Sequence, residues 1–186
     1  YGRSAQTDRP RDAINISDEM RTMLGALSVP PPYLLVGHSL GGIYTQAFAR
    51  RFSGDTAGIV LVDTTLPGQT RYLRTNAAAQ FAAVSAIMRL ENATVRREFQ
   101  DAEAAEDQVE RLSPYRAGPV ILLAATEPDP VAPRAFSDWR RARMRELADE
   151  YGGELRLIES GHFIQREKPG EVIAAIQATL SQARRP

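Results

Sequence analysis

The chain has 186 residues, and its 23 basic and 23 acidic side chains give a formal net charge of zero. This balance gives no support for binding to nucleic acid or to an anionic membrane. No apolar run approaches the roughly 18 residues that a membrane span needs, and no secretory signal pattern is present, so we favour the cytoplasm as the compartment. Cysteine is absent, which excludes disulfides and thiolate chemistry. Two histidines are too few for a histidine-rich metal site, and we expect neither a metal nor a cofactor.

The first predicted element is a helix over residues 12–27, followed by a proline stop at 30–32. Asp12 is placed to cap the helix, and the prolines disfavour helical geometry at the residues before them. Apolar residues recur at spacings of three and four, which predicts one apolar helix face: Ile16, Met20, Met23, Leu24 and Leu27.

Residues 33–52 combine a short strand, a tight turn and a helix. Residues 33–36 are apolar, residues 43–52 contain no helix breaker, and the turn between them reads GHSLGG. This is the G-x-S-x-G pattern of a nucleophile elbow, in which a strained turn exposes the serine. We expect side chains at Gly37 and Gly41 to collide with the neighbouring strand and helix. We also expect the Leu40 N–H to point toward an oxyanion formed at Ser39. The alternative is an ordinary glycine-rich turn whose serine only caps the helix.

A second apolar strand, residues 57–62, ends at Asp63, and its helical connection to the first predicts a parallel sheet. Residues 68–116 are rich in alanine, glutamate and arginine, and predict helices that could cover the strand ends as a cap. We interpret the charges of residues 95–112 as a solvated helix face.

Two further strands are predicted at 119–125 and 155–158, separated by a helix over 133–151, and a last helix begins at Pro169. In an open α/β sheet, functional groups gather at the carboxyl ends of the strands. The four ends here bring together a serine, two acids and a histidine: Ser39, Asp63, Asp129 and His162.

Serine needs a base to accept its proton, and that base needs a carboxylate to orient it and stabilise its charge. His162 is the predicted base, because it follows the last strand in the order serine, acid, histidine. His38 is expected to point to the other side of the elbow as a packed or hydrogen-bonded residue. Asp63 and Asp129 both remain candidates for the orienting acid.

With these motifs, the chain resembles the α/β-hydrolase family. GHSLGG at 37–42 is similar to the family's nucleophile motif, TEPDPV at 126–131 to its acid loop, and SGHFIQREKP at 160–169 to its histidine segment. The resemblance implies Ser39, Asp129 and His162 as the catalytic residues, with Leu40 in the oxyanion hole. It also implies a helical cap at 65–118. Some members of the family place the acid at the position of Asp63.

The resemblance covers all 186 residues, but only the later part of the fold. YGRSAQTDRP at 1–10 resembles the loop after the family's fourth strand, so the earlier strands and the second oxyanion donor are expected to be missing. The predicted fold class is therefore α/β, a partial α/β-hydrolase domain with a mostly parallel sheet flanked by helices. Such a piece is expected to have an open apolar sheet edge and weak activity on its own.

The implied function is a serine hydrolase that cleaves a small-molecule ester or related acyl substrate through an acyl-enzyme. The alternatives are a non-catalytic ligand-binding or receptor-like protein with the same fold, or an inactive fragment.

Overall fold

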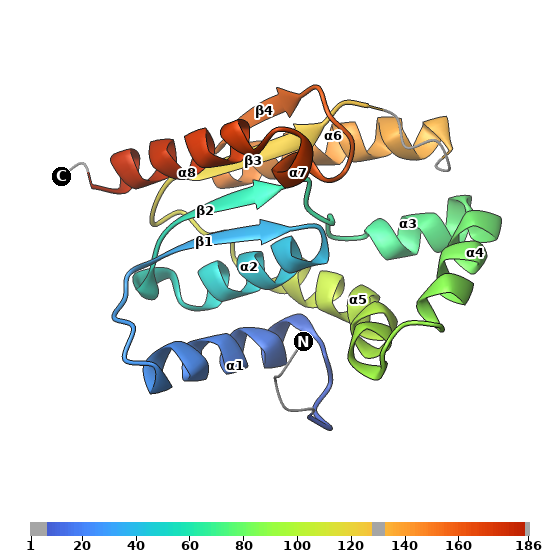
Figure 1. Ribbon diagram of the computed structural model, residues 1–186, viewed down its shortest axis with the longest axis horizontal. Coiled ribbons are helices and arrows are strands. Elements are labelled where there is room, and N and C mark those ends of the chain that lie inside the picture. Colours follow the sequence, from blue (N-terminus) through green and yellow to red (C-terminus); the bar gives the residue numbers. More distant parts are fainter. Residues whose placement is uncertain (1–6, 128–132, 185–186) are drawn as a thin grey trace.

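A computed structural model describes residues 7–127 and 133–184 of the chain. Their four strands form one parallel sheet in the order β1-β2-β3-β4 (Figure 1). The strands are β1 (Tyr33–His38), β2 (Thr56–Val62), β3 (Val120–Ala125) and β4 (Glu154–Ile158). Each is joined to the next by one or more helices, as parallel pairing requires. The predicted α/β class is confirmed.

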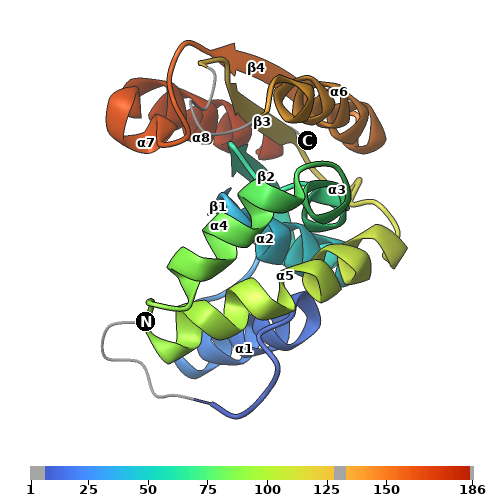
Figure 2. The same cartoon turned by 90° about the vertical axis from the view of Figure 1, so that its right-hand side faces the viewer.

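Both faces of the sheet are covered, which explains why β2 and β3 are apolar at successive positions. Ile59 and Leu61 pack in a core with side chains of α2 (Leu40–Arg51) and α6 (Arg134–Tyr151). The alternate residues Val60 and Val62 pack in a second core with α7 (Ile164–Glu167) and α8 (Pro169–Ala183). Figure 2 shows α7 and α8 on one side of the sheet and α6 on the other.

Helix α1 (Ala13–Ala26) forms an outer layer on α2. The Asp12 side chain accepts a hydrogen bond from the Asn15 N–H at 2.9 Å, so the prediction that Asp12 is the N-cap of this helix is confirmed. Ala13 and Ile16 are buried against α2 and α5. Met23 and Leu27 are exposed, because only one side of this outer helix is covered.

The predicted cap segment forms three helices between β2 and β3: α3 (Gln69–Asn76), α4 (Ala78–Met88) and α5 (Ala93–Arg111). α3 and α4 lie beyond the carboxyl ends of the strands, whereas α5 runs back beside α1 and α2 (Figures 1 and 2). Glu106 of α5 is buried, so the prediction of a wholly solvated face is wrong there. The reason is that α3 packs over this part of α5, where Thr70 of α3 bonds the Glu106 carboxylate.

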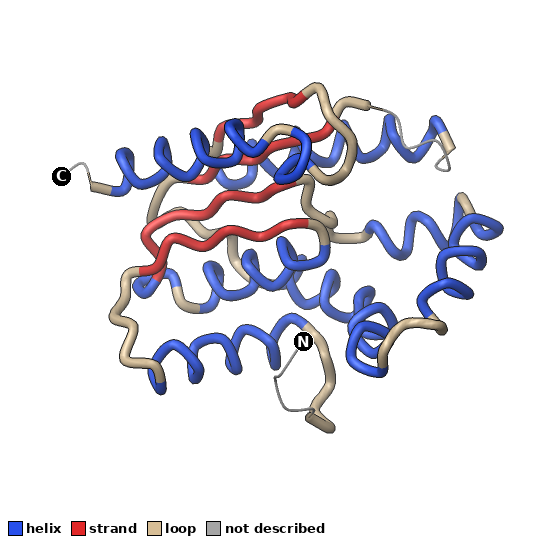
Figure 3. The backbone as a smooth tube through the Cα atoms, in the orientation of Figure 1, coloured by secondary structure: helices blue, strands red, loops and turns tan. Residues whose placement is uncertain are grey.

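Among the described residues, β1 and β4 are the edges of the sheet (Figure 3). β4 is short, as predicted for an edge strand. On β1, Val36 is 45% exposed, so this edge is apolar as expected. Within the described ranges, no helix has the length and apolar character needed to cross a membrane.

Candidate active site

The turn between β1 and α2 holds Ser39 in a strained conformation, with φ 53° and ψ −129°. Such a conformation is costly for a residue with a side chain and persists only when its surroundings hold it. Here the Ser39 N–H donates to the Val62 carbonyl at 3.2 Å. The Ser39 carbonyl accepts from Gly42 N–H at 2.9 Å and Thr65 N–H at 3.0 Å. β2 and the loop that follows it therefore lock the elbow in place.

The elbow needs two glycines, but they are not both the ones predicted. A Cβ at Gly37 would lie 2.7 Å from the Gly41 carbonyl oxygen and closer still to Thr45 Oγ1, as predicted. At Gly41 a Cβ would meet nothing within 4 Å, so the predicted collision there is wrong, because that position faces open space. Gly42 is the second crowded position, where a Cβ would lie 2.6 Å from that of Thr64.

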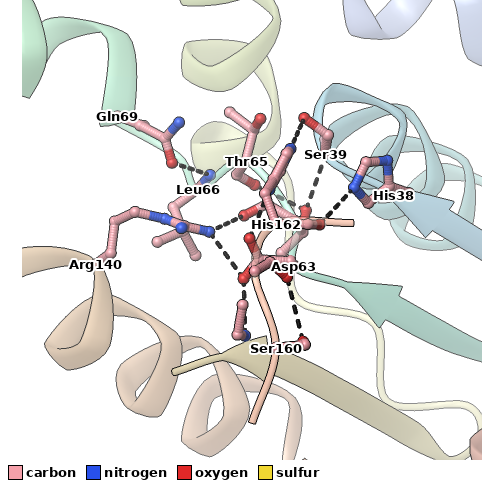
Figure 4. A network of polar contacts seen from close by, with 12 residues as sticks. His38, Ser39, Asp63, Thr65, Leu66, Gln69, Arg140, Ser160 and His162 are labelled. Atoms are coloured by element: carbon pink, nitrogen blue, oxygen red, sulfur yellow. Dashed lines mark hydrogen bonds and ion pairs between the residues drawn. The ribbon is translucent and has the colours of Figure 1, made fainter. Parts of the chain in front are cut away.

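His162 lies in the loop after β4, between Ser39 and Asp63 (Figure 4). Its Nε2 is 3.1 Å from Ser39 Oγ, and its Nδ1 is 2.6 Å from Asp63 Oδ2. An ionised carboxylate only accepts hydrogen bonds, so Nδ1 carries the proton and donates it to Asp63. Nε2 is then free to accept from the Ser39 hydroxyl. A neutral imidazole in this tautomer can act as a general base toward the serine.

Asp63 directly follows β2, and its side chain is only 2% exposed. Its Oδ1 accepts from the Ala125 N–H at 3.0 Å and from Arg140 Nη2 at 3.2 Å, which leaves Oδ2 for His162. Burial alone would raise the pKa of Asp63. The hydrogen bond from His162, the charge of Arg140 and the Ala125 N–H together outweigh burial, and the pKa lies below its usual value.

The acid favoured from the sequence, Asp129, lies outside the described residues, so its assignment stays a prediction. The carboxylate at His162 Nδ1 is that of Asp63, the alternative. The backbone of Asp63, which has a left-handed φ of 39°, helps to direct its side chain toward His162. Aspartate tolerates that region better than most residues.

His38 lies beside His162, with ring centroids 4.6 Å apart. Its Nε2 is 3.0 Å from the His162 carbonyl oxygen, to which it donates, so the prediction of a hydrogen-bonded His38 is confirmed. The ring is not on the far side of the elbow as expected, because this bond holds it against the histidine loop. Burial lowers the pKa of His38 below its usual value, although the hydrogen bond opposes the shift.

Leu40 is the first residue of α2, and an N–H at that position has no acceptor within the helix. Its assignment as the oxyanion donor is compatible with this placement and stays a prediction. A hollow of about 890 Å³ adjoins Asp63 and His162 and extends along α6 and β4. In the described part of the chain, no cluster of three or more His, Cys, Asp or Glu residues could hold a metal ion.

Arg140 is the site residue that the sequence analysis missed. It lies in α6, and three of the five residues that follow it are also arginines. One signal could have identified it: Arg140 falls four residues before the buried Met144 and seven before the buried Leu147, on the inward stripe of the helix. A charge on such a stripe requires a buried partner, which here is Asp63.

The fold and this site have the organisation of an α/β-hydrolase. The Alpha/beta hydrolase family matches residues 1–176, and the chain belongs to that family. One similar sequence is the uncharacterized protein YqjL of Bacillus subtilis, 38% identical over 65 residues, which are 35% of this chain and 26% of YqjL. An uncharacterized protein of Schizosaccharomyces pombe is 40% identical over 48 residues, 26% of this chain and 9% of that protein. The matches thus span about a quarter or less of these relatives.

Solved structures with a similar fold cover most of the chain. A carboxylesterase of the thaumarchaeon Nitrososphaera gargenis has a TM-score of 0.61 and 18% identity over 92% of this chain and 72% of its own. A thermophilic esterase from Thermogutta terrifontis has a TM-score of 0.60 and 19% identity over 100% and 78%. Est816, described as an N-acyl homoserine lactone degrading enzyme, has a TM-score of 0.56 and 20% identity over 94% and 78%. At these identities the likeness shows the fold.

Proposed function

We propose that the protein is a serine hydrolase that cleaves an ester or related acyl substrate, with Ser39 as nucleophile, His162 as base and Asp63 as the orienting acid. The observation that carries the proposal is the continuous chain of contacts from Ser39 Oγ to His162 Nε2, 3.1 Å, and from His162 Nδ1 to Asp63 Oδ2, 2.6 Å. The esterases of similar fold are compatible with this reaction class.

In the proposed mechanism, Ser39 Oγ attacks the substrate carbonyl carbon while His162 Nε2 takes the hydroxyl proton. The carbonyl π electrons move to oxygen, and the resulting oxyanion is stabilised by the Leu40 N–H. When the tetrahedral intermediate collapses, the bond to the leaving alcohol breaks and His162 returns its proton to that oxygen. Water then attacks the acyl-enzyme with His162 again as the base, which releases the acid and restores Ser39.

The buried Asp63 has two roles in this scheme. It keeps the proton on Nδ1, so that Nε2 faces Ser39 as an acceptor, and it stabilises the imidazolium that forms during both half-reactions. Its lowered pKa favours the ionised form that these roles require. We further propose that α3 and α4 act as the cap, since they lie beyond the strand ends next to the site (Figure 2).

A fluorophosphonate probe and a chromogenic acyl ester test this proposal on the purified protein. The probe is expected to label wild type at Ser39 and to leave Ser39→Ala unlabelled. The ester is expected to give a burst of chromophore equal to the labelled fraction, followed by slower turnover. A well-folded wild type that neither labels nor turns over would contradict the proposal and favour a ligand-binding protein or an inactive fragment.

A further inference from the structure

Arg140 of α6 contacts the candidate acid, Asp63. We infer that Arg140 is a positioning residue: its guanidinium holds Asp63 as a buried anion with Oδ2 aimed at His162 Nδ1. This inference rests on the proposed function and extends it to α6.

The first step is electrostatic. The Asp63 side chain is 2% exposed, and a buried carboxylate is costly unless it is paired. His162 supplies a hydrogen bond to Oδ2 and a smaller electrostatic contribution than Arg140. Arg140 Nη2 lies 3.2 Å from Asp63 Oδ1 and supplies the positive charge. Its contribution lowers the pKa of Asp63, second to that of the His162 hydrogen bond among the effects that lower it.

The second step is geometric. Arg140 and the Ala125 N–H both bind Oδ1, so that the carboxylate cannot rotate to offer His162 the other oxygen without losing two bonds. The same Arg140 Nη2 lies 3.4 Å from the Thr64 carbonyl oxygen, which ties α6 to the loop after β2 (Figure 4). The neighbouring Thr65 N–H binds the Ser39 carbonyl. One guanidinium thus contacts both the acid and the loop that holds the elbow.

Other ionisable groups lie near the pair but do not bind Asp63. His38 faces it from β1 and is hydrogen-bonded to the His162 backbone. Further charged residues of α6 and of the loop after β3 line the adjoining hollow: Glu127, Arg134, Asp138 and Arg141. Among the arginines and lysines of residues 7–127 and 133–184, Arg140 alone lies within ion-pair distance of Asp63.

The test compares Arg140→Gln, Arg140→Lys and a matched control, Arg143→Gln. Arg143 lies three residues further along α6, has a similar side-chain exposure of 29% against 24%, and pairs with Glu146 away from the site. The readouts are kcat and KM for an acyl ester across pH, the rate of fluorophosphonate labelling, and the thermal midpoint of unfolding.

Arg140→Gln is expected to reduce kcat about 10- to 100-fold with little change in KM, by analogy with residues that orient the ligands of a metal. Without the cation, the Asp63–His162 pair holds its proton more tightly, so the acid limb of the kcat/KM profile moves to higher pH. Arg140→Lys keeps the positive charge, so it should return the acid limb of the kcat/KM profile to its wild-type pH and recover part of the lost kcat. Arg143→Gln should match wild type.

Arg140→Gln with a wild-type acid limb and rate would overturn the inference, as would a loss of rate that Arg143→Gln shares. In either case normal labelling of Ser39 in wild type would leave the proposed function intact. Absence of labelling in wild type would instead contradict the proposed function itself, and with it this inference.

Discussion

Two buried carboxylates, Asp63 at the end of β2 and Glu106 in α5, differ in their pKa: burial of Glu106 favours its protonated form, whereas the contacts of Asp63 favour its ionised form. Both accept a backbone N–H and a side-chain donor: Ala125 and His162 for Asp63, and both groups of Thr70 for Glu106. The pKa of Asp63 is lowered. Burial raises the pKa of Glu106 to about 7, because the bonds from Thr70 do not compensate for desolvation.

The main difference between them is a cation. Arg140 contacts Asp63, whereas the charged groups that act on Glu106, Glu103 and Asp107, are acidic and raise its pKa further. Burial therefore does not by itself determine whether an acid is ionised. At the candidate site, the Arg140 countercharge favours the ionised form of the Asp63 carboxylate. Among residues 7–127 and 133–184, no salt bridge reaches Glu106, so ionisation of Glu106 destabilises the native state.

The largest expected effect comes from neutralising each acid. Asp63→Asn should lower turnover of an acyl ester by about 10⁴-fold, because an amide favours the wrong imidazole tautomer. Glu106→Gln should leave turnover close to that of wild type, since Glu106 has no contact with Ser39, His162 or Asp63 among its hydrogen bonds. Steady-state kinetics of both variants at pH 8 measure this difference, and similar losses would contradict the contrast between the two acids.

The next effect concerns stability. The native state holds the Glu106 proton more tightly than the unfolded state between pH 4.5 and about 7. Its contribution is thus most favourable below pH 4.5, declines as pH rises to about 7 and is constant above. The loss is about 3 kcal/mol of unfolding free energy at 1.36 kcal/mol per pKa unit. Glu106→Gln should avoid it, and be more stable than wild type at pH 8 but not at pH 4.5.

Urea unfolding of both proteins at the two pH values gives this comparison directly. Other carboxylates titrate alike in both proteins, so they cancel in the difference. An equal pH dependence of wild type and Glu106→Gln would show that Glu106 does not titrate near neutral pH.

A smaller effect is expected from Thr70→Val, which removes the Oγ1 donor 2.6 Å from Glu106 and keeps the backbone N–H. The cost should be about 2 kcal/mol at pH 8, where the acceptor is charged, and less at pH 5. Thr22→Val is the control, because its hydroxyl bonds the neutral Asp18 carbonyl. A pH-independent cost for Thr70→Val would argue against a titrating partner.

Sequence patterns predicted the four strands, because strands depend on short-range signals. They also placed Ser39 and His162 at neighbouring strand ends, where the two side chains lie 3.1 Å apart, while the catalytic roles of both residues stay predictions. Both Asp63 and Asp129 follow ends of predicted parallel strands, and the prediction favoured Asp129. What favours Asp63 is its left-handed φ of 39° and the bond of its Oδ1 to Ala125, both products of the folded sheet. Gly42, rather than Gly41, is crowded for a similar reason: Thr64 reaches it from the next strand's loop.

Arg140 and Glu106 were missed for one common reason. Glu106 was interpreted as part of a solvated helix face, and Arg140 was not singled out among the charges of its helix. Yet Arg140 is in register with the buried Met144 and Leu147, and Glu106 with the buried Ala102 and Val109. A charged residue at the period of a buried helix face is a signal that periodicity can reveal, although its partner is visible only in three dimensions.

The central claim is that Asp63 holds the Nδ1 proton of His162. The most direct measurement is the proton NMR resonance of that N–H in protein labelled with ¹⁵N-histidine, assigned by its loss in His162→Gln. A short hydrogen bond to a buried carboxylate should place this resonance far downfield. We predict that it is present in wild type and in Asp129→Asn and is lost in Asp63→Asn. Its persistence in Asp63→Asn and loss in Asp129→Asn would contradict the account.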